Sequence, residues 1–70
     1  MKRAIYVGET CGNLHYGATG TVIRRSLVGG RDAVLFDFDD PDVLFGDREM
    51  IYRDAVYISS EDQTRHYPKP

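Results

Sequence analysis

Short apolar runs, separated by glycine, proline and aspartate, give this sequence its pattern. The runs are rich in β-branched and aromatic residues, which predicts β-strands. No segment repeats apolar residues at the helical spacing of three and four, so the predicted class is all-β. The strands are predicted over residues 4–7, 21–27, 33–38, 49–53 and 55–59.

The second and third predicted strands are joined by two glycines at residues 29–30, which predicts a tight hairpin. Both central residues of a type I′ turn need a positive φ, which glycine adopts without strain. With these two glycines as the whole loop, Ile23 faces Phe36. Arg24 then faces Leu35. The side expected to face the core carries Ile23, Leu27, Val34, Phe36 and Phe38.

The register of this hairpin has an alternative. In the register above, Val22 is expected to point outward. A β-bulge near Gly20 or in the turn would reverse part of the assignment, because a slip of one residue moves every side chain to the other face. The hairpin itself is predicted under either register.

The order of strands and loops predicts a small barrel. A long polar loop over residues 9–19, the tight hairpin and a brief turn at Asp54 separate the strands. This order fits a closed five-stranded SH3-like barrel made from a strongly bent antiparallel sheet. One domain is therefore predicted over residues 1–60. The polar residues 61–70 predict a flexible tail, so deletion from Asp62 onward is expected to leave the melting temperature unchanged.

Length and cysteine content indicate the size of the core and the cellular compartment to expect. Seventy residues suffice for one domain with a thin core, which favours a homodimer because association buries more apolar area. Cys11 is the one cysteine, which is typical of a reducing compartment. The apolar run over residues 4–7 is too short for a signal peptide or a membrane span. We therefore expect a cytoplasmic protein with no membrane partner.

Three segments carry a resemblance to a known superfamily. Residues 17–22 read Gly-Ala-Thr-Gly-Thr-Val, residues 33–38 read Ala-Val-Leu-Phe-Asp-Phe, and residues 54–58 read Asp-Ala-Val-Tyr-Ile. With these segments the chain resembles the SH3-like barrel superfamily over residues 4–59, and within it the KOW-type members. The resemblance implies the fold but no binding specificity, because the chain lacks a tryptophan for the aromatic groove that binds polyproline.

An acidic and aromatic set of residues is the first candidate binding surface. Phe45 ends an apolar triplet inside an acidic loop, and apolar residues ringed by charge are typical interface centres. The triplet has an alternative role as a lid over one end of the barrel. The acidic side chains favour a basic protein partner. The predicted partner-binding residues are Tyr16, Asp39, Asp40, Asp42, Val43, Leu44, Phe45 and Tyr52.

The arginines around the hairpin are the second candidate surface. Arginine beside tyrosine can bind phosphate and stack on bases. Carboxylates are interleaved with these arginines, so cross-strand ion pairs explain them without a ligand. The net charge of −2 also lacks the basic balance typical of nucleic-acid binders. The predicted nucleic-acid residues are Arg24, Arg25, Arg31 and Tyr16.

Groups suited to catalysis or metal binding are few. Cys11, His15 and His66 do not supply the four ligands of a structural zinc site, and the acidic loop lacks the spacing of an EF-hand. No nucleophile and base stand at a spacing typical of a catalytic site. We therefore expect no enzyme activity, no metal and no cofactor. The predicted function is a protein-interaction module or an accessory or regulatory subunit, with a KOW-like module for nucleic acid or ribonucleoprotein as the alternative.

Overall fold

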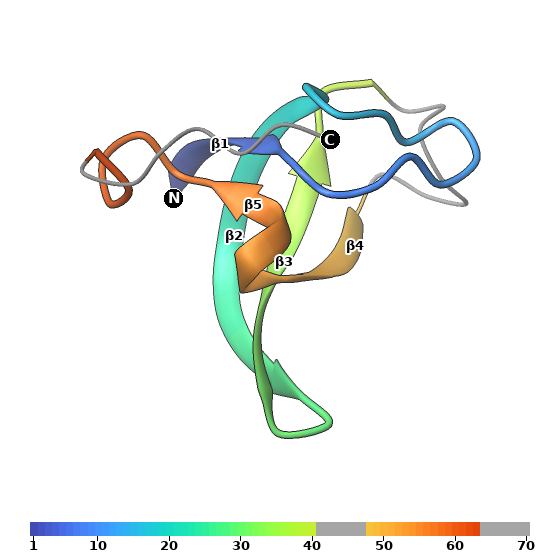
Figure 1. Cartoon of the computed structure of the whole chain (residues 1–70). Helices are drawn as coiled ribbons and strands as arrows, with labels where there is room; N and C mark the ends of the chain where they lie inside the picture. The colour runs from blue at the N-terminus through green and yellow to red at the C-terminus, as the bar shows by residue number, and fades with distance from the viewer. Residues whose placement is uncertain (41–47, 64–70) are drawn as a thin grey trace.

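A curled antiparallel sheet forms the fold (Figure 1). The computed structural model describes residues 1–40 and 48–63. None of these residues forms a helix with the length and apolar character needed to cross a membrane. The prediction of an all-β fold is confirmed. The elements are β1 (Lys2–Tyr6), β2 (Thr19–Val28), β3 (Arg31–Phe38), β4 (Arg48–Tyr52), the 3₁₀ turn η1 (Arg53–Ala55) and β5 (Val56–Tyr57).

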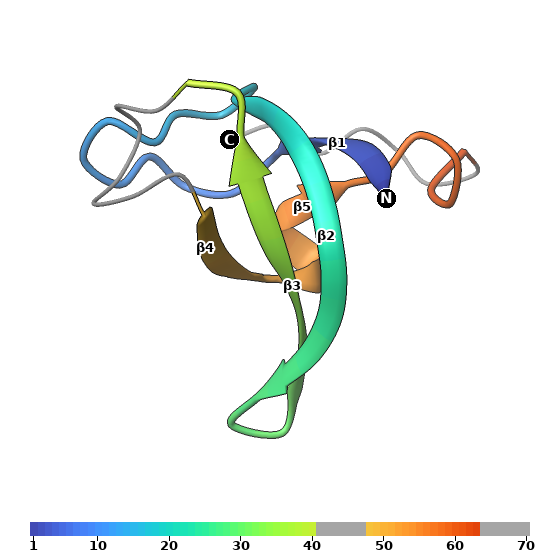
Figure 2. The ribbon, with the colours of Figure 1, turned by 180° about the vertical axis from the view of Figure 1, so that it is seen from behind.

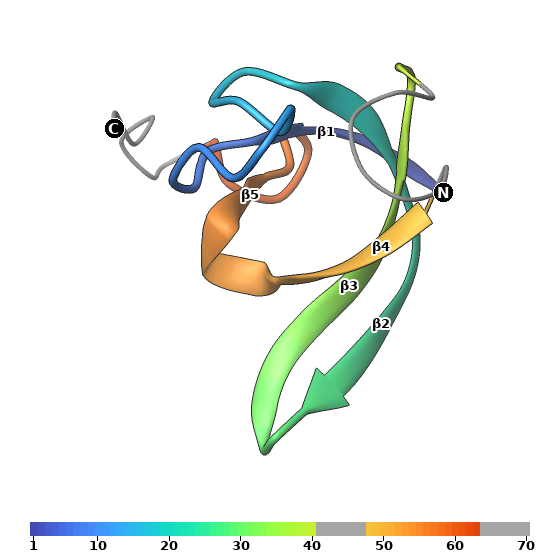
Figure 3. The same cartoon turned by 90° about the vertical axis from the view of Figure 1, so that its right-hand side faces the viewer.

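The five strands are ordered β4-β3-β2-β1-β5 across the sheet. β2 is the central strand and it bends strongly, so that β1 and β5 cross one of its ends (Figures 1 and 3). From behind, β2 and β3 run side by side along their whole length (Figure 2). β4 and β5 are the outer strands, and no pairing joins them within the described part of the chain. The sheet is therefore a half-barrel.

The chain between β4 and β5 forms a turn where the sequence predicted the ends of two strands. Residues 53–55 form η1, so β4 ends at Tyr52, one residue before the predicted 49–53 does, and β5 is shorter than the predicted 55–59. The backbone N–H of Val7 donates to the carbonyl oxygen of Ala55 at 2.8 Å, which fixes the turn beside the end of β1. The brief turn predicted at Asp54 is this 3₁₀ turn.

The core lies on the inner side of the half-barrel. Alternate residues of β3 supply its centre, because successive side chains of a strand point to opposite faces. The rings of Phe36 and Phe38 pack with centroids 4.6 Å apart. The buried cluster contains Ala4, Tyr6, Leu14, Val22, Val34, Phe36, Phe38, Val56 and Ile58.

The hairpin between β2 and β3 has the predicted two-residue loop. Gly29 and Gly30 have φ values of 58° and 81°, and Val28 pairs with Arg31. Both glycines thus adopt the left-handed conformation that a type I′ turn requires. The tight hairpin is confirmed.

A β-bulge changes the register further along the hairpin. The predicted pairing of Arg24 with Leu35 is confirmed, but the register shifts between Val22 and Arg24. Val22 therefore faces Phe36 and is buried. The predictions that Ile23 faces Phe36 and that Val22 points outward are wrong, because the extra residue of a bulge moves the following side chains to the other face.

Leu27 was predicted in the core, and this too is wrong, since it is 66% exposed. β1 pairs with β2 only as far as Val22, and β4 pairs with β3 only from Ala33 onward. The tip of the hairpin therefore projects beyond the strands that cover the core (Figure 3). Leu27 lies on this projecting part, opposite Asp32.

Candidate functional site

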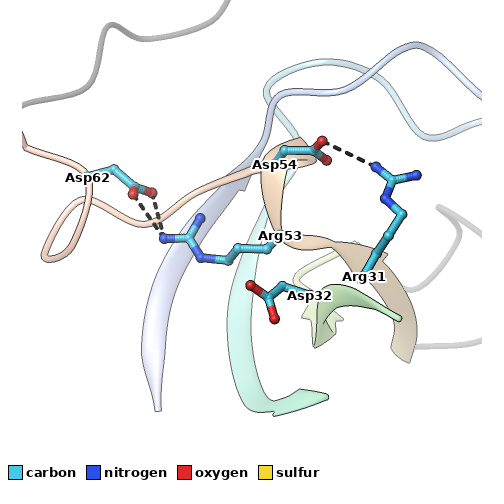
Figure 4. Close-up of a pocket in the computed structure, with 5 residues that line it drawn as sticks. All are labelled: Arg31, Asp32, Arg53, Asp54 and Asp62. Atoms are coloured by element: carbon cyan, nitrogen blue, oxygen red, sulfur yellow. Dashed lines mark hydrogen bonds and ion pairs between the residues drawn. The ribbon is translucent and has the colours of Figure 1, made fainter. Parts of the chain in front are cut away.

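A groove beside the hairpin gathers charged side chains from three parts of the chain (Figure 4). Its volume is about 510 Å³. The start of β3, the turn η1 and the segment after β5 each contribute to it. We call it the hairpin groove, and it is lined by Arg31, Asp32, Arg53, Asp54 and Asp62.

One wall of the hairpin groove is an ion pair between Arg53 and Asp62. Nη2 of Arg53 donates to both carboxylate oxygens, at 2.9 and 3.0 Å, and Nη1 donates to the carbonyl oxygen of Val56 at 2.9 Å. The backbone N–H of Ile58 donates to the Asp62 carboxylate at 2.8 Å. The two charged side chains are only 17% and 12% exposed, so salt screens this pair little. The pair fixes the segment after β5 against η1.

The opposite wall is a stacked arginine. The guanidinium carbon of Arg31 lies 3.8 Å from the centre of the Tyr52 ring, which is a cation–π contact. Nη2 of Arg31 also donates to the carboxylate of Asp54 at 3.2 Å. Ring and carboxylate together restrict the arginine, so this wall is formed before any partner arrives. Tyr52 itself remains 38% exposed.

Between these walls lies Asp32, which has no hydrogen bond or ion pair to any other residue of the described ranges. In Figure 4 the dashed lines join Asp62 and Asp54 to arginines, and none reaches Asp32. Its cross-strand partner is the exposed Leu27. A carboxylate and a leucine side by side match a partner residue with an apolar stem and a polar or positive tip.

A second groove lies between the first long loop and the end of β3. Its volume is about 310 Å³. We call it the loop groove, and it is lined by Asn13, His15, Gly17, Ala18, Thr19, Asp39 and Asp40.

The loop groove is built around Asp39, whose oxygens already have partners. Arg3 donates to the Asp39 carboxylate through both terminal nitrogens, one of them at 2.8 Å, and the Thr19 hydroxyl donates at 2.7 Å. The hydrogen bond from Arg3, followed by that from Thr19, holds the pKa of Asp39 well below its usual range. The carboxylate thus links the ends of β1, β2 and β3, which is a structural role.

The acidic and aromatic residues predicted to bind a partner lie in separate places. Tyr16 is half-buried in the first long loop, and Asp39 and Asp40 follow the end of β3. Tyr52 pairs with Ala33 near the start of β3, about 20 Å away along the strand at 3.3 Å per residue. Only Tyr52 therefore adjoins the hairpin groove. The other residues predicted to bind the partner, Asp42, Val43, Leu44 and Phe45, lie outside the described ranges.

The arginines predicted to bind nucleic acid are mostly engaged with carboxylates. Arg25 is paired with Glu61 and Arg31 with Asp54. Arg24 is exposed, and no ion pair joins it to another described residue. Further pairs are Arg3–Asp39, Arg48–Asp37 and Arg53–Asp62. This is the ion-paired arrangement that the sequence offered as the alternative to a ligand site.

Cys11 and His15 lie in the same loop without forming a common site. Cys11 is exposed and forms a backbone bridge with Leu14, while His15 lines the loop groove, which Cys11 does not. Within residues 1–40 and 48–63, no three side chains of His, Cys, Asp and Glu are grouped as metal ligands. His66 lies outside those ranges.

Sequence reasoning missed most of the hairpin groove. Leu27 was assigned to the core, and Asp62 to a tail without contacts. One signal for the groove is present in the sequence, since Asp32 and Asp54 are among the carboxylates that are interleaved with the arginines. A comparison of the chain with models of known families, with curated proteins and with solved structures found no match.

Proposed function

We propose that this chain is an SH3-like protein-interaction module without catalytic activity, and that its partner binds at the projecting hairpin. The observation that carries the proposal is the juxtaposition of Leu27 and Asp32. A leucine that is 66% exposed and a carboxylate without a partner among the described residues lie side by side. Both gain from a partner, because burial removes apolar area from water and a donor would satisfy the carboxylate.

The surroundings of this pair suit recognition by a surface that is already formed. The Arg31–Tyr52 stack and the Arg53–Asp62 ion pair restrict the side chains on either side. A surface held in this way loses little conformational entropy on binding. Tyrosine and arginine are also the residue types enriched at the centres of interfaces. We infer a partner that supplies an apolar contact for Leu27 and a hydrogen-bond donor or cation for Asp32.

Nucleic-acid binding has less support from the same residues. A phosphate would have to compete with Glu61 for Arg25 and with Asp54 for Arg31. One face of the Tyr52 ring is covered by Arg31, which leaves less of it for base stacking. The nuclease treatment in the experiment below therefore distinguishes nucleic-acid binding from protein binding.

The proposal is tested by capture from a lysate of the native source, with and without nuclease. Wild-type protein is compared with Leu27→Ser, and with Thr10→Ser, an exposed change outside the hairpin. The proposal expects one protein that is retained after nuclease treatment by the wild type and by Thr10→Ser but lost from Leu27→Ser. Capture that disappears with nuclease, or that is equal for all three proteins, contradicts it.

A further inference from the structure

The second half of β2 has a free edge. β1 pairs with β2 from Thr19 to Val22 only, whereas β3 pairs with β2 as far as Val28. On the side away from β3, no other described residue pairs with positions 24–28. Figures 1 and 3 show this part of the hairpin extending away from β1 and β5. We call positions 24–28 of β2 the free edge.

The register identifies the backbone groups that point outward. Val28 and Arg31 flank the two-residue turn, so they form the pair that exchanges backbone hydrogen bonds. Hydrogen-bonded and non-hydrogen-bonded pairs alternate along an antiparallel ladder. The pairs of Leu27 and of Arg25 are therefore the non-hydrogen-bonded ones, and their N–H and C=O groups point away from β3. Two residues at the correct spacing thus offer unpaired backbone groups to an added strand.

The charge beside the free edge is positive. Lys2 and Arg25 share one carboxylate, that of Glu61, with Lys2 at 3.0 Å. Arg24 precedes Arg25 in β2, so its side chain lies on the opposite face of the strand, and it forms no ion pair with another described residue. Glu61 thus supplies one negative charge against three positive ones, apart from its weaker contact with Arg53 at 3.5 Å. A strand that carried carboxylates would complement this edge.

The same charges disfavour a second copy of this chain as the occupant. Antiparallel pairing of two β2 edges with Arg25 opposite Arg25 of the second copy would place like charges side by side. Like charges on neighbouring strands destabilise their pairing, and charged edges are a common means of preventing association between identical sheets. The positive edge therefore selects an acidic strand from a different protein.

We propose that the free edge of β2 binds an extended segment of a protein partner in which acidic and apolar residues alternate, by adding it to the sheet as a further strand. Backbone hydrogen bonds to Arg25 and Leu27 supply the attachment, and Arg24 selects for the carboxylates, as in other cases of strand addition. This deepens the proposed function, on which it rests, because it names the kind of partner segment.

Amide hydrogen exchange measured by NMR tests this proposal directly. The probes are a blocked synthetic peptide in which valine and glutamate alternate and its counterpart with lysine in place of glutamate. With the glutamate peptide at about ten times its Kd, exchange at the amides of Arg25 and Leu27 should slow roughly tenfold, as mass action requires. The lysine peptide should leave both amides unchanged. No protection by the glutamate peptide, or equal protection by both peptides, overturns the proposal.

Two variants separate this inference from the proposed function. Arg24→Glu should abolish the preference for the glutamate peptide, whereas Thr10→Glu, which adds a negative charge in the first loop, should not. Asp32→Asn should weaken capture of the cellular partner but leave the glutamate peptide bound, because Asp32 lies on β3 and not on the free edge. Protection that depends on Asp32 contradicts strand addition. Asp32-dependent capture without peptide protection leaves the proposed function standing and removes the free edge as its site.

Discussion

The guanidinium of Arg53 donates hydrogen bonds to both carboxylate oxygens of Asp62, at 2.9 and 3.0 Å. These hydrogen bonds join η1 to the chain that follows β5. The backbone around this pair turns back on itself, since the N–H groups of Glu61 and Asp62 both donate to the carbonyl oxygen of Ile58. Ile58 is fully buried. The ion pair therefore covers one end of a thin core.

Asp62→Asn should destabilise the domain. A hydrogen bond to a charged group contributes about 1.5–3 kcal/mol to stability, and the side chains of Arg53 and Asp62 are largely shielded from water. For a domain of this size, a loss of about 1 kcal/mol lowers the melting temperature by roughly 4–8 °C. Thermal unfolding followed by circular dichroism measures the shift, with the exposed Gln63→Ala as the control. Equal melting temperatures for both variants would show that the pair is not stabilising. The same contacts revise the expectation for deletion from Asp62 onward, which should now lower the melting temperature.

Gly20→Ala should destabilise the domain for a steric reason. A methyl group at this position would meet the Phe36 ring and the carbonyl oxygen of Asp37, and forced overpacking costs about 1–3 kcal/mol. Gly29→Asn should be far milder, because no atom lies near its added side chain and asparagine tolerates a positive φ. Urea unfolding of both variants gives the two free energies. A larger loss for Gly29→Asn would contradict this packing argument.

The projection of the hairpin tip beyond β1 and β4 makes a prediction about two large apolar residues of the hairpin. Phe36→Ala should cost about 3–5 kcal/mol because Phe36 is fully buried. Leu27→Ala should change the free energy of unfolding by no more than about 0.5 kcal/mol, as is usual for an exposed side chain. Denaturant titrations of the two variants distinguish a projecting hairpin tip from one that is packed into the core. A large loss for Leu27→Ala would place this residue in the core after all.

The carboxylate of Asp39 gives a pH-dependent prediction. Its pKa is lowered by hydrogen bonds from Arg3 and Thr19, so its contribution to stability is complete above the unfolded-state pKa of about 3.9. That contribution is lost as the pH falls through the lower native pKa. The stability difference between wild type and Asp39→Asn should therefore shrink on acidification. Carboxyl carbon NMR measures the pKa itself, and Arg3→Gln should return it toward the usual range. An unchanged titration in Arg3→Gln would assign the shift to another cause.

Much of the fold was predictable from local signals in the sequence. The apolar runs identified the strands, and the two glycines at residues 29–30 identified a hairpin, because both signals act over a few residues. The bulge at Ile23 was not predictable in position. Val22 and Ile23 are both apolar, so either could face the core, and only the packing of Val22 against the core decides between the registers.

The hairpin groove was harder to predict, since its parts come together through tertiary structure. Asp62 follows a polar stretch that is typical of a mobile tail, and its partner Arg53 becomes available only because η1 ends the fourth strand early. Leu27 is exposed because β1 and β4 end before they reach it. The ends of these strands depend on contacts between residues that are far apart in the sequence. The sequence did indicate that Tyr52 lies on a binding surface and that arginines and carboxylates pair across neighbouring strands, as Arg48 of β4 and Asp37 of β3 do.

The affinity of the captured partner for Leu27→Ser tests the central claim most directly. Isothermal titration should give a Kd at least about fivefold weaker than that of the wild type, because truncation of a central interface side chain costs more than about 1 kcal/mol. The melting temperature of the variant should match that of the wild type, since Leu27 is exposed. An unchanged Kd with an unchanged melting temperature would contradict a binding surface on the projecting hairpin.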